Sequence, residues 1–111
     1  MEVTFSNRKL QDLCNSHKRL RAEYGDRMAR VIERRLLDLQ AAANLEEMRL
    51  LPGRCHELTR DLKGWLALDL VHPKRLCFEP DHKPLPQRAD GSLDWGNVTR
   101  VKIVGIGDYH D

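Results

Sequence analysis

The chain changes its hydrophobic period once, at Pro52 and Gly53, and this change limits the folds that are open to it. Before this point apolar side chains recur every three or four residues, which is the spacing of one helix face. After it, apolar and polar side chains alternate, as they do in half-buried strands. Proline and glycine together mark a break between such segments. The sequence therefore predicts an α+β fold, with helices before residue 52 and strands after it.

The helical part is expected to be a hairpin over about residues 6–43. A first helix is predicted over 6–14, with Ser6 as its cap, and residues 15–26 are read as a turn. The second helix, from about 26 to 43, carries an apolar stripe that must be buried against another layer. The stripe consists of Met28, Val31, Ile32, Leu36, Leu39 and Ala43. After it, "NLEE" (44–47) has the spacing of a capping box and predicts one more short turn.

The part that alternates is expected to form a small antiparallel sheet over about residues 54–106. Leu66, Leu68 and Leu70 share one face of their strand, and this face is expected to receive the helices. The segment 80–97 is rich in proline, glycine and aspartate, and we expect a long connection there that Trp95 holds against the body. The predicted strands are 54–59, 64–71, 75–79 and 100–106, with a further short strand at 1–5.

Composition places the chain among ordinary globular domains. Of its 111 residues 41% are hydrophobic and 32% are charged, which suits one domain over 1–111. No apolar run is long enough for a membrane span, and the first residues lack the apolar core of a signal peptide. The three cysteines form no C-x-x-C pair, which favours reduced thiols over disulfides or zinc. We therefore expect a cytoplasmic protein with no metal, no cofactor and no membrane partner.

One face of the predicted sheet is left open by the helices and gathers polar side chains. If Leu76 and Phe78 face the helices, Arg75 faces away from them. Strict alternation along 100–106 puts Arg100, Lys102, Val104 and Ile106 on one side. The chain ends shortly after this strand, so its last side chains are expected at the rim of the sheet. The candidate set is Arg54, His56, Lys63, Arg75, Lys102, Asp108, Tyr109 and His110.

These residue types suit cleavage of an RNA phosphodiester without metal. The 2′-hydroxyl needs a base and the 5′-oxygen needs an acid, and histidine can serve in either step. Fixed Arg and Lys side chains stabilise the negative charge that develops on the phosphorus. A tyrosine supplies a hydroxyl donor or a ring on which a base can stack. Each residue alone also has an ordinary structural explanation, as a strand, turn or terminal residue.

The order of these segments resembles a known family. Pro52, Gly53, His56 and Leu58 resemble a "P-G-x-R-x-H-x-L" strand, with one residue fewer between the glycine and the histidine, and Lys63-Gly64 match a "K-G" turn. Arg75, Leu76 and Phe78 match an "R-(I/L)-x-F" strand, and the last motif is "(D/E)-Y-H", here Asp108, Tyr109 and His110. Together they resemble HigB-like toxins of the RelE/ParE superfamily over nearly the whole chain. The segment 80–97 is longer than the family's usual turn, and Asp111 is an extra residue after the histidine.

The resemblance implies the toxin of a type II toxin–antitoxin system. Such a toxin is an mRNA interferase that cuts messenger RNA in the ribosomal A site and so inhibits translation. It implies catalytic roles for His56, Asp108, Tyr109 and His110, and phosphate contacts for Lys63 and Arg75; Arg54 and Lys102 are further candidates for binding RNA. It also implies a helix-turn-helix, HigA-like antitoxin, with operator DNA bound only through the toxin–antitoxin complex. Two alternatives stay open: a ParE-like gyrase inhibitor, against which the "DYH" ending speaks, and a non-catalytic binding module.

Overall fold

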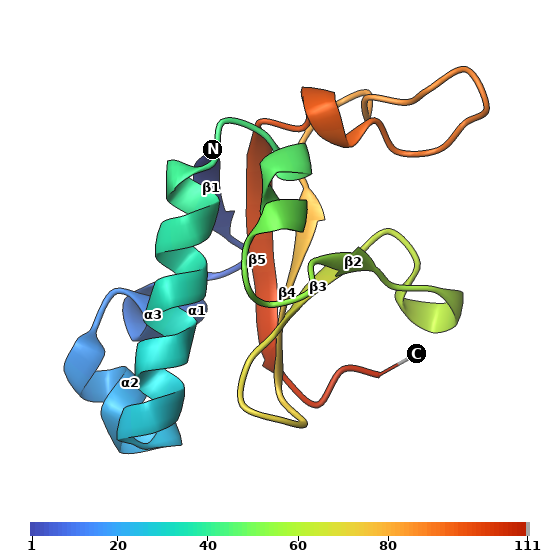
Figure 1. The fold of residues 1–111 in the computed structure, drawn as a ribbon. Coiled ribbons are helices and arrows are strands. Elements are labelled where there is room, and N and C mark those ends of the chain that lie inside the picture. The colour runs from blue at the N-terminus through green and yellow to red at the C-terminus, as the bar shows by residue number, and fades with distance from the viewer. Residues whose placement is uncertain (111) are drawn as a thin grey trace.

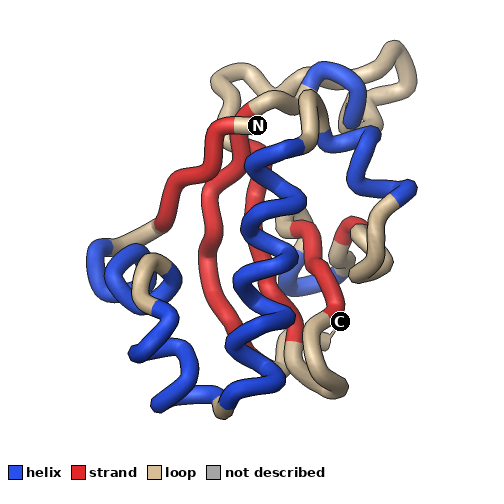
Figure 2. Tube along the Cα trace, turned by 60° about the vertical axis from the view of Figure 1, so that its left-hand side comes forward, coloured by secondary structure: helices blue, strands red, loops and turns tan. Residues whose placement is uncertain are grey.

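The computed structural model describes residues 1–110, and Asp111 lies outside the described residues. A five-stranded sheet has the order β1-β5-β4-β3-β2. Three helices cover one face of it, and α3 runs lengthwise beside the long strands (Figures 1 and 2). The helices are α1 (Arg8–Cys14), α2 (His17–Tyr24) and α3 (Asp26–Ala41); the strands are β1 (Glu2–Phe5), β2 (His56–Glu57), β3 (Leu66–Asp69), β4 (Arg75–Pro80) and β5 (Arg100–Gly107). The predicted α+β class, with helices on a small sheet, is confirmed.

The core lies between α3 and the covered face of the sheet. The buried residues of α3 recur every three or four positions, with two neighbours at the first turn: Met28, Ala29, Ile32, Leu36 and Leu39. They join Leu66, Leu68, Leu76, Phe78, Val101 and Ile103 of the sheet in one apolar cluster. The predicted leucine face therefore does receive the helices.

The helical region differs from the predicted hairpin in two places. Residues 17–24 form α2, where a turn was expected, because Ser16 caps the segment by accepting a hydrogen bond from Arg19 N at 3.2 Å. Leu20 is the one fully buried residue of α2, so the helix gives little periodicity to detect. The cap of α1 is Asn7, whose Oδ1 accepts from Leu10 N at 2.8 Å, and not Ser6.

The sheet is mixed, because β1 pairs parallel to β5 while the other pairings are antiparallel. A β-bulge interrupts the β4–β5 pairing: Cys77 pairs with Gly105, but Phe78 pairs with Ile103. The extra residue, Val104, resets the alternation of side chains along β5. Ile106 therefore packs toward the helices, and its predicted place beside Val104 on the open face is wrong.

The segment 80–97 is a folded connection that projects from one end of the sheet (Figure 1). It contains a short 3₁₀ turn, η3 (Trp95–Asn97), and a bridge between Gln87 and Leu93. Trp95 is 3% exposed and donates a hydrogen bond from Nε1 to Glu57 Oε2 at 3.1 Å. The expectation that Trp95 holds this connection against the body is confirmed. Another 3₁₀ segment, η1 (Leu45–Leu50), begins at the predicted "NLEE", where Asn44 Oδ1 accepts from Glu47 N.

Candidate active site

The last residues of the described chain lie against the open face of the sheet. After β5 the backbone turns back from the sheet toward the side on which β2 lies (Figure 1). Arg75 donates a hydrogen bond from Nη1 to the carbonyl of Tyr109 at 2.9 Å, and its side chain is only 12% exposed. The Tyr109 ring meets Trp65 edge to face, with centroids 5.9 Å apart. These contacts fix the position of the tail although it lies beyond the last strand.

Two glycines of β5 make room for the tyrosine. A Cβ atom on Gly105 would collide with the hydroxyl of Tyr109, and one on Gly107 would lie 3.2 Å from Tyr109 Cε2. The tyrosine ring therefore lies directly on the backbone of β5, on the face opposite the helices. Glycine is needed here for its lack of a side chain. The "G-I-G" spacing before "DYH" was the sequence signal for this close approach, and the motif reading missed it.

His110 is held by two oxygen acceptors. Its Nε2 lies 2.7 Å from Asp108 Oδ1 and 3.0 Å from the carbonyl of Pro73. Both partners can only accept, apart from a protonated carboxyl, so Nε2 carries the hydrogen and donates it. This leaves Nδ1 as the ring nitrogen available for proton exchange with a ligand.

His56 is oriented in a similar way from the other side of the site. Its Nδ1 lies 2.7 Å from the carbonyl of Arg54, which accepts, so Nδ1 carries the hydrogen. In the neutral ring the lone pair is then on Nε2, which can take a proton. Arg54 itself has a left-handed backbone, with φ of 50°, which is uncommon for a residue other than glycine. After this turn, β2 lies next to β3 in the sheet and carries His56 on the open face.

Asp69 connects the two halves of the site. Its Oδ2 accepts from Arg54 Nε at 2.9 Å, and its Oδ1 lies 3.3 Å from Arg75 Nε. Burial acts to raise the pKa of Asp69, but the hydrogen bond from Arg54 and the charges of Arg54 and Arg75 outweigh it, so the pKa lies below its usual value. His56 is near enough to add to this lowering. Sequence reasoning missed Asp69, although its place on the open face of β3 was visible in the alternation.

The clustered residues surround a cavity of about 400 Å³. Arg54, Asp69, Arg75 and His110 line it, together with His72 and Lys74 from the β3–β4 link. Three separate segments of the chain thus bring three of the predicted site residues, Arg54, Arg75 and His110, to the cavity. The other three are joined to them by direct contacts: Asp108 to His110, His56 to the carbonyl of Arg54, and Tyr109 to Arg75. The charged lining of the cavity is basic apart from Asp69. Such a site suits an anion that must exchange protons.

Two predicted RNA-binding residues lie elsewhere. Lys102 is paired with Glu79, with Nζ 3.2 Å from Oε1, toward the end of the β4–β5 ladder opposite Arg75 and Gly107. Lys63 lies in the turn before β3 and lines a different cleft, described below. Neither residue lines the cavity at His110.

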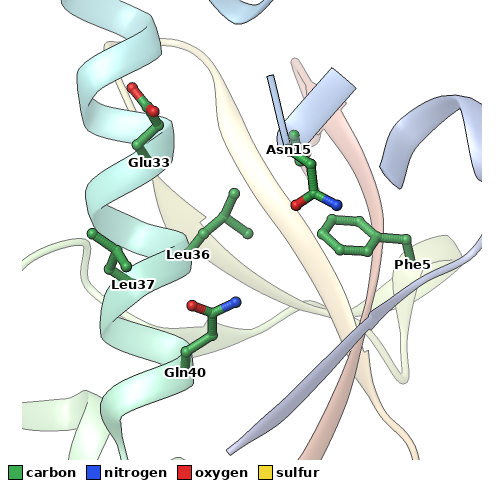
Figure 3. Close-up of a pocket in the computed structure, with 7 residues that line it drawn as sticks. Phe5, Asn15, Glu33, Leu36, Leu37 and Gln40 are labelled. Carbon is green, nitrogen blue, oxygen red and sulfur yellow. The ribbon is translucent and has the colours of Figure 1, made fainter. Parts of the chain in front are cut away.

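A separate cavity of about 260 Å³ lies on the other side of the molecule. It is formed between Phe5 of β1, Asn15 after α1, and the α3 side chains Glu33, Leu37 and Gln40 (Figure 3). No predicted site residue lines it. Within residues 1–110 no three His, Cys, Asp or Glu side chains gather closely enough to hold a metal ion, and no helix is long and apolar enough to cross a membrane.

Comparison with known proteins identifies the fold. No protein-family model matches the sequence, and no curated protein matches it. Two solved structures superpose over nearly all of the chain. A YoeB/ParE toxin from Agrobacterium tumefaciens aligns over 99% of this chain and 100% of its own, with a TM-score of 0.58 and 10% identity. A YoeB dimer from Staphylococcus aureus aligns over 100% and 98%, with a TM-score of 0.55 and 20% identity. The fold is thus that of YoeB/ParE toxins.

Proposed function

We propose that the chain is a HigB-like toxin of a type II toxin–antitoxin system, and that it is an endoribonuclease that cuts mRNA on the ribosome. The observation that carries the proposal is the placement of His110, Arg54 and Arg75 around one cavity, on a fold that toxins of this class use. His56 is oriented by the carbonyl of Arg54, and Tyr109 is held by Arg75. The motifs resembling HigB supply the finer assignment. The fold alone would fit several toxins.

The geometry supports a metal-independent acid–base reaction. His56 Nε2 takes the proton of the ribose 2′-hydroxyl, and the 2′-oxygen attacks the adjacent phosphorus. Arg54 and Arg75, held by Asp69, stabilise the added negative charge. His110, oriented by Asp108, donates a proton from Nδ1 to the 5′-oxygen as its bond to phosphorus breaks. The products are a 2′,3′-cyclic phosphate and a free 5′-hydroxyl, so one proton is taken up and one is released. Tyr109 stacks on or hydrogen-bonds the nucleotide.

The partners follow from this assignment. The substrate is mRNA in the ribosomal A site, which places the protein in the cytoplasm. A helix-turn-helix antitoxin similar to HigA would silence the toxin, and operator DNA would be bound only by the pair. Lys63 and Lys102 remain candidates for contacts with the RNA backbone outside the cavity.

The test is cleavage of mRNA by the purified chain on programmed ribosomes. We expect cuts with 2′,3′-cyclic ends in the wild type, and a loss of rate of about 100-fold or more in His110→Gln. His17→Gln is the matched control, because this histidine pairs with Glu33 on the helical layer, and it should cut normally. Both variants should retain the melting temperature. Normal cutting by His110→Gln would remove this residue from the mechanism, and intact mRNA with gyrase-linked DNA breaks would favour a ParE-like inhibitor.

A further inference from the structure

A second cleft lies beside the candidate active site and is built largely by the long connection 80–97. Its volume is about 580 Å³, which is within the range of small-molecule sites. The side formed by the sheet consists of Leu58, Trp65 and Leu66, of which the leucines are almost fully buried. The opposite wall consists of Leu85, Gln87 and Leu93 from the connection. The cleft therefore has apolar walls with a few polar groups at its edge.

The wall from the connection is held in place. Asp94 N donates to the carbonyl of Pro86 at 2.9 Å, and Arg88 N donates to that of Ser92 at 2.8 Å. At its base, the indole of Trp95 is fixed by Glu57 and is covered by the guanidinium of Arg49 at 3.7 Å from the ring centroid. A preformed wall loses little entropy when a ligand enters. Leu85 on this wall is still 43% exposed, so its side chain offers a ligand in the cleft an apolar surface.

Trp65 connects this cleft to the candidate active site. It lines the cleft, and its ring also meets Tyr109, the residue next to His110. A strand of RNA held with its phosphate near His110 would thus pass an aromatic pair before reaching the cleft. Lys63 stands at the edge of the cleft and offers a positive charge to a backbone phosphate. Aromatic faces, apolar walls and a nearby cation are the groups that hold an unstacked base in single-stranded RNA.

We propose that this cleft binds one unpaired nucleobase of the RNA, a nucleotide or two from the bond that is cut. The inference rests on the proposed function and adds to it a second subsite that the connection 80–97 creates. The base lies against Trp65 and Leu85, and its backbone phosphate pairs with Lys63. Cleavage then depends on the nucleotide in this cleft as well as on the one at the cut bond.

The experiment uses ribosomes programmed with mRNA in which an abasic residue replaces each nucleotide near the cut in turn. We expect the abasic residue at one position, away from the cut bond, to slow cleavage by the wild type about tenfold, as loss of one stacked base does. Leu85→Asp should cut intact mRNA about tenfold more slowly and should no longer distinguish it from the abasic mRNA. Leu50→Asp is the matched control, since Leu50 is 89% exposed and lies outside the cleft, and it should behave as the wild type.

Several results would overturn the inference. One is an unchanged wild-type rate with every abasic mRNA, and another is a Leu85→Asp variant indistinguishable from Leu50→Asp; both leave the proposed nuclease intact. If Leu85→Asp cuts normally but escapes its antitoxin, the cleft binds a protein and the inference fails. If no chain cuts mRNA, the proposed function fails. Binding of a 2′-deoxy trinucleotide then decides about the cleft. If only Leu85→Asp loses this binding, the inference that the cleft binds a base stands. If all chains bind the trinucleotide equally, the inference fails.

Discussion

Asp69 contributes to the site by fixing two positive charges, and it needs no direct contact with a ligand to do so. Its two carboxylate oxygens hold Arg54 and Arg75, which come from different segments. Arg75 in turn holds the backbone of Tyr109. Two contacts, Asp69 to Arg75 and Arg75 to Tyr109, therefore connect β3 to the tail. If Asp69 loses its charge, Arg54 loses its partner at the cavity and Arg75 keeps only the carbonyl of Tyr109.

The Asp69→Asn variant tests this role through pH. The pKa of Asp69 is lower in the folded chain than in an unfolded one, so its contribution to stability is present above about pH 4 and is lost as the pH falls further. The side chain is 38% exposed and solvent screens it, so we expect a loss of about 1 kcal/mol or less at pH 7. Urea unfolding at pH 7 and near pH 3 should show this difference shrinking in acid.

A second aspartate provides the control for this measurement. Asp12 forms an exposed ion pair with Arg8, one helical turn away. Asp12→Asn should change stability by less than 0.5 kcal/mol or so at either pH. The cleavage rate of Asp69→Asn should fall, because the arginines are no longer held in position. Asp12→Asn should cut at the normal rate. Equal stability changes for the two variants, independent of pH, would contradict the assigned role of Asp69.

At the scale of elements, strand β5 determines where the tail lies. Its bulge shifts the alternation so that Gly105 faces the open side, and the absence of a side chain there lets Tyr109 rest on the backbone. Gly105→Ala should displace the tyrosine ring while leaving the strand intact, because alanine is otherwise acceptable in a strand. We expect a fall in cleavage of about tenfold or more, since misplacing a positioning group strongly affects rate.

The readout for this variant is the near-ultraviolet circular dichroism of the Trp65–Tyr109 pair, measured beside the cleavage rate. Gly96→Ala is the matched control, because a Cβ there meets nothing closer than 3.7 Å, and it should leave both signals unchanged. If Gly105→Ala retains the aromatic signal and the full rate, the close approach of Tyr109 to β5 has no functional role.

The elements show which features a single sequence can specify. The stripe of α3 and the leucine face of β3 were predictable because each repeats its period several times. The α2 helix was not, because Leu20 is its one buried residue, and the bulge was not, because it depends on pairing between β4 and β5. For the same reason His56 and His110 could be named as candidates, but the contacts that orient their rings could not be predicted. Asp69 was missed because its effect arises only when three segments meet.

At the scale of the whole molecule, the sheet separates a large apolar core from a small one. The large core lies under the helices, while Leu58, Ala67 and Cys77 form the small one beneath the candidate site. Cys77 is fully buried in it, between β3 and β5, so any ligand site on this face is supported by an apolar layer. The three thiols of the described chain are free, and burial raises the pKa of each.

Because of these thiols, the free energy of unfolding should fall as the pH rises into the alkaline range. Burial raises the pKa of Cys77 to about 12, so the folded chain keeps this proton while the unfolded chain loses it near pH 9. A raised pKa contributes stability that is complete below the unfolded value and is lost as the pH rises toward the folded one. One such group lowers the free energy of unfolding by about 1.4 kcal/mol for each pH unit between pH 9 and 11.

The Cys77→Ala variant isolates this slope from the titration of lysines and tyrosines. Its smaller side chain should cost about 1 kcal/mol at pH 7, where the thiol is neutral in both states. Because the variant has no proton to lose at this position, its free energy of unfolding should fall less steeply than that of the wild type above pH 9, and the two curves should converge or cross by about pH 10. Urea unfolding at pH 7, 9 and 10 under reducing conditions measures both curves. Parallel curves over this range would mean that the Cys77 thiol ionises as readily in the folded chain as in the unfolded one, and that the small core beneath the site is open to water.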